Sequence, residues 1–202
     1  MNPYVSIDIE TTGLDPDTCQ VLSIGAVIDD GKSPIEELPT FHCYVDNGVI
    51  RGEPYALSMH PKILRAIATG ETEVWIFKPN EVATDFQMWL DRHDMASYAP
   101  KAKIVPAGKN FDSFDRQFLR RLPNWEQYIR LKHRSIDPGN LYFQPSDDGP
   151  PDTKECMQRA GITGEVAHTA LEDAVVVVKL IRYWAANRHM MPARIPLPKF
   201  GE

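Results

Sequence analysis

The stretch from Tyr4 to Pro16 constrains the fold of this chain more than any other, because it combines strand periodicity with two acids. Asp8 and Glu10 flank one apolar residue, and residues two apart in a strand point to the same face. Neighbouring carboxylates repel each other and lose hydration, which is tolerated best when a hard cation such as Mg²⁺ or Mn²⁺ binds between them. The alternative is an edge strand with a solvated acidic face.

Length and composition limit the class of protein. The chain has 202 residues, enough for one domain, with 43% hydrophobic and 25% charged residues, which is typical of soluble globular proteins. A net charge of −6 argues against a protein that coats nucleic acid non-specifically, since such proteins are usually basic. It does not exclude an enzyme that acts on nucleic acid, because bound metal ions neutralise phosphates locally.

Segments that would target the chain to a membrane are not expected. No run approaches the roughly 18 apolar residues of a transmembrane helix, and the N-terminus lacks the basic and apolar regions of a signal peptide. The three cysteines are isolated and have no metal-ligand spacing, which fits buried thiols in a reducing compartment. We therefore expect a cytoplasmic protein without membrane contact.

The periodicity predicts an α/β domain. Strands are expected over residues 5–9, 20–29 and 40–45 as an antiparallel meander, with a short strand at 104–105 and a further one at 134–136. Helices are expected over 61–69, from a cap at Asn80, over 113–121, from a cap at Asp152 to a stop at Gly161, and from Thr169 onward. Apart from the helix at 61–69, the stretch 47–73 is expected to be irregular, and 140–151 is expected to be a loop. Strands followed by alternating helices and strands indicate one mixed sheet covered by helices. The predicted domain spans 1–189, and 190–202 is a Pro-rich C-terminal tail.

The last predicted helix contains a conflict between local preference and pattern. The run Val175–Val178 is β-branched and favours a strand, whereas the apolar residues from Leu171 to Ala185 keep helical spacing. The capping pattern formed by Thr169 and Glu172 supports the helix. We therefore expect a helix.

Two later stretches supply further acids. Asp112 suits the N-cap of a helix, and Asp115 would lie in its first turn, where the helix dipole favours an acid whatever its function. In the second stretch Asp173 lies early in the last helix and His168 just before it. A loop histidine beside an acidic metal site suits a general base with a pKa near ~6.5.

Together the three stretches resemble the DEDDh family of 3′–5′ exonucleases, which have the ribonuclease H-like fold. The motifs are an acid pair followed by TTGLDP, then NFDSFDRQFL, then a histidine five residues before an acid, and they span residues 4–184. The stretch 106–137 is most similar to oligoribonuclease, while the insert at 47–80 is unlike that subgroup. The resemblance implies a mixed five-stranded sheet flanked by helices.

The resemblance also implies roles for particular residues. The family's second acid stands after an aromatic residue and before xxFL, which selects Asp115 over Asp112. By resemblance, two Mg²⁺ or Mn²⁺ ions are held by four acids and His168 is the general base, while other positions meet the substrate. The implied metal and catalytic acids are Asp8, Glu10, Asp115 and Asp173; the implied substrate-binding residues are Thr11, Thr12, Leu14 and Asn110.

The expected activity is hydrolysis of terminal phosphodiesters in short or single-stranded nucleic acid, releasing nucleoside 5′-monophosphates, with RNA favoured. One alternative is a DNA proofreading or repair exonuclease, and another is a catalytically silent module that binds nucleic acid. Relatives of the oligoribonuclease subgroup imply a homodimer. The basic residues between Arg116 and Arg134 are expected either to meet phosphates or to be solvated helix charges.

Overall fold

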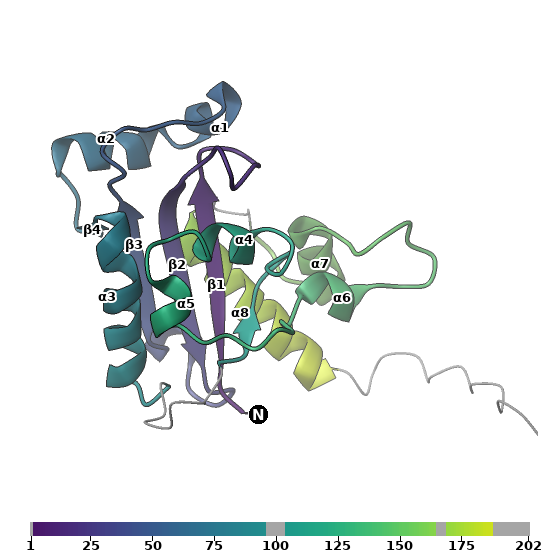
Figure 1. Cartoon of the computed structure of the whole chain (residues 1–202). Coiled ribbons are helices and arrows are strands. Elements are labelled where there is room, and N and C mark those ends of the chain that lie inside the picture. The colour runs from purple at the N-terminus through teal and green to yellow at the C-terminus, as the bar shows by residue number, and fades with distance from the viewer. Residues whose placement is uncertain (1, 96–103, 165–168, 188–202) are drawn as a thin grey trace, which may run out of the picture.

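A computed structural model describes residues 2–95, 104–164 and 169–187. They form a five-stranded mixed sheet with the strand order β4-β3-β2-β1-β5 (Figure 1). The first three strands are the predicted antiparallel meander, and β4 and β5 join its two edges in parallel. The strands are β1 (Tyr4–Thr11), β2 (Val21–Asp29), β3 (Thr40–Val45), β4 (Trp75–Phe77) and β5 (Pro106–Ala107).

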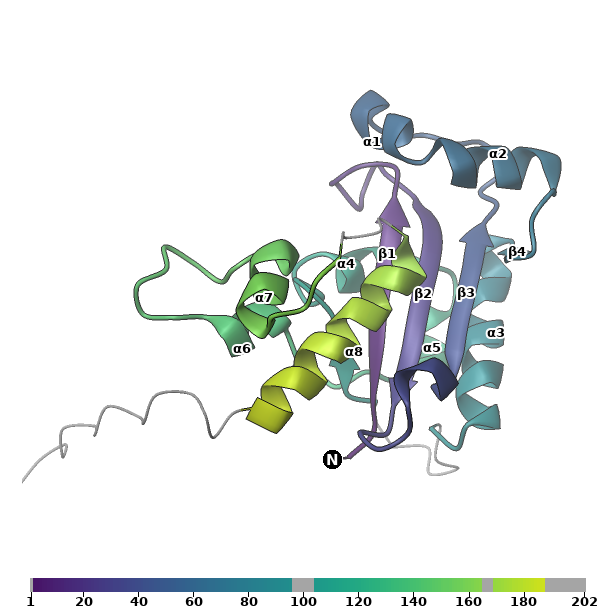
Figure 2. The same ribbon diagram turned by 180° about the vertical axis from the view of Figure 1, so that it is seen from behind.

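Helices cover both faces of the sheet. Figure 1 shows α3, α4 and α5 on one face, and Figure 2 shows α8 crossing the other. Helices α1 and α2 lie beyond the end of the sheet at which β1 finishes, and α6 and α7 lie beside α8. The helices are α1 (Pro54–Met59), α2 (Pro61–Thr69), α3 (Pro79–Arg92), α4 (Asp115–Leu119), α5 (Trp125–Tyr128), α6 (Pro138–Tyr142), α7 (Thr153–Ala160) and α8 (Ala170–Asn187), with a 3₁₀ turn η1 (Ile35–Glu37).

The alternation of β1 divides its side chains between the two layers. Val5, Ile7 and Ile9 pack in the core with α3, α4 and α5, which also contains Phe86 and Trp125. The even-numbered residues of β1 face α8. Ser6 Oγ, for example, donates a hydrogen bond of 2.8 Å to the backbone carbonyl of Ala174 in that helix. The period of two therefore directs Asp8 and Glu10 toward α8.

The last helix follows its spacing rather than its β-branched composition. Helix α8 continues through Val175–Val178, and the residues of one face, including Ala174, Val178 and Ile181, pack against the sheet. Thr169 Oγ1 accepts a hydrogen bond from Glu172 N (3.4 Å) at its start. Burial of an apolar face thus outweighs the weak strand propensity of valine.

Several predicted boundaries are wrong. Helix α3 begins at Pro79 with Lys78 as its N-cap, so Asn80 is not the cap; proline suits the first position because no N–H is needed there. The strand expected at 104–105 is shifted to β5, and Ile104 makes only an isolated bridge to Leu131.

The region around the second motif also differs. The helix expected over 113–121 is limited to α4, and 134–136 contributes only the bridge from Ile136 to Ala107. Helix α1 lies in the stretch predicted to contain α2 alone, and α6 overlaps the predicted 140–151 loop. Among the described residues, no helix is long and apolar enough to cross a bilayer. The predicted tail, 190–202, lies outside the described residues.

Candidate active site

Three carboxylates from the two ends of the chain converge where β1 ends. Asp8, Glu10 and Asp173 each offer one ligand atom, and these atoms all lie within 4.8 Å of one another. The two β1 residues meet the third because α8 begins against the same face of the sheet. The strand period predicted that Asp8 and Glu10 share a face, and the family resemblance implied that Asp173 joins them.

A glycine allows this close approach. Gly25 is the β2 partner of Asp8, and a Cβ added to it would come within 2.2 Å of the backbone of Ala170, the first residue of α8. Since no side chain fits there, only glycine lets the first turn of α8 rest on the sheet beside Asp8. No local sequence pattern around Gly25 predicts this role.

The fourth acid, Asp115, is attached to the same strand. Its side chain is 3% exposed, and Oδ1 accepts a hydrogen bond of 3.1 Å from the backbone N–H of Ile9. Strand β5 pairs with β1 only at Val5 and Ser6, so the edge of β1 is not covered by β5 at Ile9. Asp115 therefore takes the place of a ladder partner at this edge.

Asp112 is not the N-cap of α4. Its oxygens accept hydrogen bonds from Arg116 Nε (2.8 Å) and Ser135 Oγ (2.8 Å), and the N-cap is Phe114, without a side-chain cap. Asp112 is thus engaged with cationic and hydroxyl partners. Asp115, which the family resemblance selected, is the acid whose charge acts on Asp8.

The electrostatics of the cluster oppose ionisation. Burial raises the pKa of Asp8 well above its ordinary value, and the charges of Asp115, Asp173 and Glu10 add to the effect. Burial, with the charge of Asp173, raises the pKa of Glu10 to about 8, and burial raises that of Asp115. A bound divalent cation would reverse this by supplying the missing positive charge. An all-carboxylate set of oxygens is the donor set that hard divalent cations prefer, so these residues fit such an ion.

His60 lies beside the acid cluster, although no sequence motif predicted it there. Its Nε2 lies 3.5 Å from Glu10 Oε2, and the two side chains are only 12% and 14% exposed. His60 joins the two helices, because it is both the C-cap of α1 and the N-cap of α2. Its only sequence signal was its position before the helix-starting Pro61. The predicted general base, His168, lies outside the described residues.

Two of the predicted substrate-binding residues form hydrogen bonds within the turn after β1, and the other two are exposed. The hydroxyl of Thr11 donates to Gly13 O (2.7 Å) and that of Thr12 accepts from Gln20 N (2.8 Å), so both stabilise the turn. Leu14 at the tip of the turn is 74% exposed, which excludes the alternative of a core-covering residue. Asn110 is exposed in a left-handed turn (φ 57°), and Lys109 Nζ donates to its Oδ1 (3.0 Å). The structure therefore gives Asn110 a partner outside the acid cluster.

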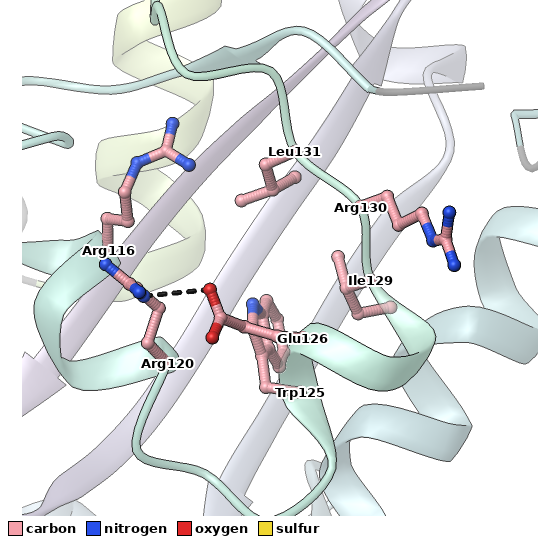
Figure 3. A pocket seen from close by; sticks show the side chains of 7 residues that line it. All are labelled: Arg116, Arg120, Trp125, Glu126, Ile129, Arg130 and Leu131. Carbon is pink, nitrogen blue, oxygen red and sulfur yellow. Dashed lines mark ion pairs between the residues drawn. The ribbon is translucent and has the colours of Figure 1, made fainter. Parts of the chain in front are cut away.

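The basic residues of the second motif are largely paired. Figure 3 shows Arg116, Arg120 and Arg130 around a cavity of about 150 Å³ that Trp125 and Glu126 also line. Arg120 Nε lies 2.9 Å from Glu126 Oε1, and Arg116 Nη2 lies 2.8 Å from Asp112 Oδ1. The expected alternatives were phosphate contacts or solvated helix charges, and these two arginines are instead paired with neighbouring acids.

The matching family model, described as Exonuclease (RNase_T), covers residues 5–181. The chain belongs to this family, and its mixed five-stranded sheet flanked by helices is the fold that the resemblance to the 3′–5′ exonucleases implied. An oligoribonuclease from Hydrogenovibrio crunogenus is 21% identical over 198 residues, which cover 92% of this chain and 94% of that protein.

Solved structures with the same fold include exonuclease I enzymes. The E. coli enzyme in complex with a dT13 oligonucleotide matches with a TM-score of 0.63 and 16% identity, over 94% of this chain. Exonuclease I from Methylocaldum szegediense matches with a TM-score of 0.62 and 18% identity, over 96% of this chain. This chain spans 42% of the length of each. A complex of the E. coli enzyme with single-stranded DNA is also known in a zinc-bound form.

Proposed function

We propose that this protein is a divalent-metal-dependent exonuclease that removes nucleoside 5′-monophosphates from the 3′ ends of short or single-stranded nucleic acid, with RNA favoured. The observation that carries the proposal is the convergence of Asp8, Glu10 and Asp173 on one point, with Asp115 attached to the same strand. Carboxylates this close together repel one another, which is unfavourable for folding alone and supports a role in binding Mg²⁺ or Mn²⁺.

Each acid has a distinct place in the proposed mechanism. One ion would be bound by Asp8, Glu10 and Asp173. A second ion would be bound by Asp8 and supported by Asp115. When bound, the ions would stabilise charge on the attacking and leaving oxygens of the phosphodiester. The hydrogen bond from Ile9 N fixes the Asp115 carboxylate, so that it is oriented before substrate binds. His168 is the proposed general base for the attacking water, on the strength of the family resemblance.

The turn after β1 would receive the terminal nucleotide. The hydroxyl contacts of Thr11 and Thr12 keep the turn in shape, and Leu14 N donates to Glu53 Oε1 (3.2 Å), which fixes its tip. Leu14 is thus held with its side chain in solvent, where it could wedge against the last base. The role proposed for these residues is positioning of the 3′ end.

The preference for RNA is tested against a specific alternative. The relative found by sequence is an oligoribonuclease, whereas the E. coli exonuclease I structure is a complex with a dT13 oligonucleotide. RNA and DNA oligonucleotides of equal sequence and length, from two to about twenty nucleotides, would be compared with Mn²⁺. Faster cleavage of RNA supports the proposal, because only RNA offers the 2′-OH. Faster cleavage of DNA would favour the proofreading or repair alternative.

The activity itself is tested with 5′-labelled oligonucleotides in Mn²⁺ and in EDTA, using wild-type, Asp8→Ala and His168→Ala proteins. Glu71→Ala, an exposed acid beyond α2, is the matched control. The expected result is a descending ladder that requires the metal and both residues but not Glu71. Absence of nucleotide release by wild-type protein that binds Mn²⁺ would favour the silent binding module. The homodimer stays a prediction, which light scattering would test.

A further inference from the structure

Helices α6 and α7 pack beside α8 (Figure 2), and a groove of about 760 Å³ lies among them. The cavity in Figure 3, by comparison, has a volume of about 150 Å³. Four of the residues that line the groove are aromatic: Tyr142, Phe143, Tyr183 and Trp184. Phe143 is 47% exposed and Tyr183 is 41% exposed, so two large rings face solvent. Because Tyr183 follows Asp173 by ten residues, about 15 Å along α8, the groove is distinct from the acid cluster.

The charged side chain in the groove is already paired. Arg159 Nη1 and Nη2 donate to the two oxygens of Asp147 at 2.7 and 2.8 Å, and Nη1 also donates to Tyr142 O (2.7 Å). The Arg159 and Asp147 side chains are only 18% and 15% exposed. An anion such as a phosphate would therefore meet a guanidinium that has its partners, whereas an apolar segment would bury the exposed rings.

The indole of Trp184 adds an unsatisfied donor. Its Nε1 is buried and has no hydrogen-bond partner among the described residues. A buried N–H that loses water without gaining an acceptor is unfavourable, and such groups are usually paired. An acceptor is therefore expected from outside the described residues, and a backbone carbonyl in the groove would supply one.

The chain reaches the edge of the groove where α8 ends. Asn187, the last described residue, lines the groove. The sequence continues through residues 188–202, which lie outside the described residues, have prolines at 192, 196 and 198, and also contain Ile195 and Leu197. Proline-rich segments favour the polyproline II conformation, whose carbonyls have no internal partners, and aromatic-lined grooves are the surfaces that bind such segments.

Charge favours the same pairing. The loop at 143–152 has no lysine or arginine and contains three acids, Asp147, Asp148 and Asp152. Asp147 is paired with Arg159, but Asp148 beside it is exposed. Residues 188–202 have one acid, Glu202, against three basic residues, Arg188, Arg194 and Lys199. A basic, proline-rich segment thus begins beside an acidic loop and an aromatic groove.

We propose that residues 192–198 of this chain bind in the groove, with proline and aliphatic side chains on the rings of Phe143 and Tyr183 and a backbone carbonyl accepting from Trp184 Nε1. Residues 188–191 are the linker that turns back along α8. So short a linker gives an effective concentration on the order of millimolar, so a contact with a Kd of about 0.1 mM keeps the segment bound for roughly nine-tenths of the time. The proposal is independent of the proposed function.

Trypsin cleavage after Arg194 in the full chain tests the proposal, because a bound segment cannot enter the protease. Tyr183→Asp and Leu197→Asp change the two sides of the contact, and each should accelerate this cleavage by about tenfold, since the segment is then free all the time. The double variant should be no faster than either single variant. Mass spectrometry follows the products, and cleavage after Arg51, which is exposed before α1, is the internal reference.

Tyr128→Asp is the matched control, because Tyr128 is 40% exposed but lies on α5, over the opposite face of the sheet from α8. It should leave cleavage after Arg194 at the wild-type rate. Leu197→Asp changes none of the described residues, and a melting curve of each variant shows that the domain is folded. Equal rates for wild type, Tyr183→Asp and Leu197→Asp would overturn the proposal.

Protein concentration separates the chain's own segment from that of a second copy. Binding within one chain should protect Arg194 equally from about 1 to 100 µM protein, because the effective concentration is set by the linker. Protection that rises with concentration would assign the segment to a second copy and overturn binding within the chain. The indole N–H signal of Trp184 in an NMR spectrum, assigned with Trp184→Phe, should shift in the Leu197→Asp protein. An unchanged signal would overturn the hydrogen bond assigned to Trp184.

Discussion

Two acids on neighbouring strands, Asp29 and Asp8, have partners of opposite charge. Asp29, at the end of β2, is fully buried, and Arg182 Nε donates to its oxygens at 3.0 and 3.2 Å. Asp8, further along the same β1–β2 ladder, meets Glu10 and Asp173 instead. Helix α8 supplies both partners, an arginine to one acid and an aspartate to the other.

The pKa values record the difference. Burial by itself would raise the pKa of Asp29, but the hydrogen bonds and charge of Arg182 bring it below its ordinary value. Burial also raises the pKa of Asp8, and the neighbouring acids raise it further. Burial is thus common to both acids, and the charge of the partner decides between a structural ion pair and a site prepared for an external cation.

The largest expected effect breaks the acid cluster. Asp8→Asn should reduce the rate of cleavage by on the order of 10⁴-fold, because a metal ligand contributes several kcal/mol to transition-state stabilisation. The same change removes a repelling charge, so thermal stability in EDTA should not fall. Single-turnover cleavage with Mn²⁺ and a melting curve in EDTA measure the two effects.

Asp148→Asn is the control for this change, since Asp148 is exposed in the loop between α6 and α7. It should leave both measurements unaltered. A rate for Asp8→Asn within tenfold of wild type would show that the cluster is not the reactive site.

The second change breaks the ion pair. Arg182→Met leaves Asp29 buried without its cation and should lower the free energy of unfolding by about 3–5 kcal/mol. The surface pair of Arg121 and Asp17, whose side chains are 44% and 74% exposed, is the comparison. Arg121→Met should cost no more than about 1 kcal/mol. Equal urea midpoints for the two variants would contradict the assigned role of Arg182.

The third comparison, between Asp115 and Asp112, tests which of the two acids belongs to the cluster. Asp115→Asn should lower the cleavage rate by roughly 10²-fold, because the Asp115 carboxylate would lose the charge with which it supports the second ion. Asp112→Asn should keep the rate within about threefold and cost about 1 kcal/mol of stability through its weaker hydrogen bonds. Steady-state kinetics and urea denaturation of both variants make the comparison. The reverse pattern would assign the active-site role to Asp112.

The smallest expected effect is the pH dependence of the metal-free protein. The pKa of Glu10 rises from 4.5 to about 8 on folding, so the folded state binds more protons than the unfolded state between these values. Stability contributed by this group is therefore complete below pH 4.5 and is lost as the pH rises toward 8. Asp29 has the opposite sign, because its lowered pKa makes stability fall in acid.

Urea denaturation in EDTA from pH 5 to 8.5 measures the first slope. Glu10→Gln should flatten it, and Mn²⁺ should reverse it, because metal binding requires deprotonated ligands. Stability of the metal-free wild type that rises with pH over this range would contradict the raised pKa values.

Elements with strong local signals were predicted well. The boundaries of α2 are those expected from Pro61 and the left-handed Gly70, and α7 runs from the Asp152 cap to Gly161. Short elements without such signals were missed. Strand β4 has three residues and is supported by contacts such as the stacking of Phe77 on Phe41, which depend on the assembled sheet.

The choice between Asp112 and Asp115 shows where local rules fail. Capping preference favoured Asp112 as a helix start, but the structure engages it with Arg116 and Ser135. Asp115 is held by Ile9 N because β5 ends before reaching that position of β1. The family resemblance selected the acid that lies beside Asp8, whereas no local pattern could reveal the uncovered edge of the strand.

The shared face of Asp8 and Glu10 follows from their spacing alone, because the period of a strand is a local property of the backbone. The position of Asp173 beside this pair depends on the packing of α8 over Gly25, and the contact of His60 with Glu10 depends on the packing of the insert. Such contacts join segments far apart in the chain. They depend on how helices pack against a sheet, which is set by the whole core rather than by neighbouring residues.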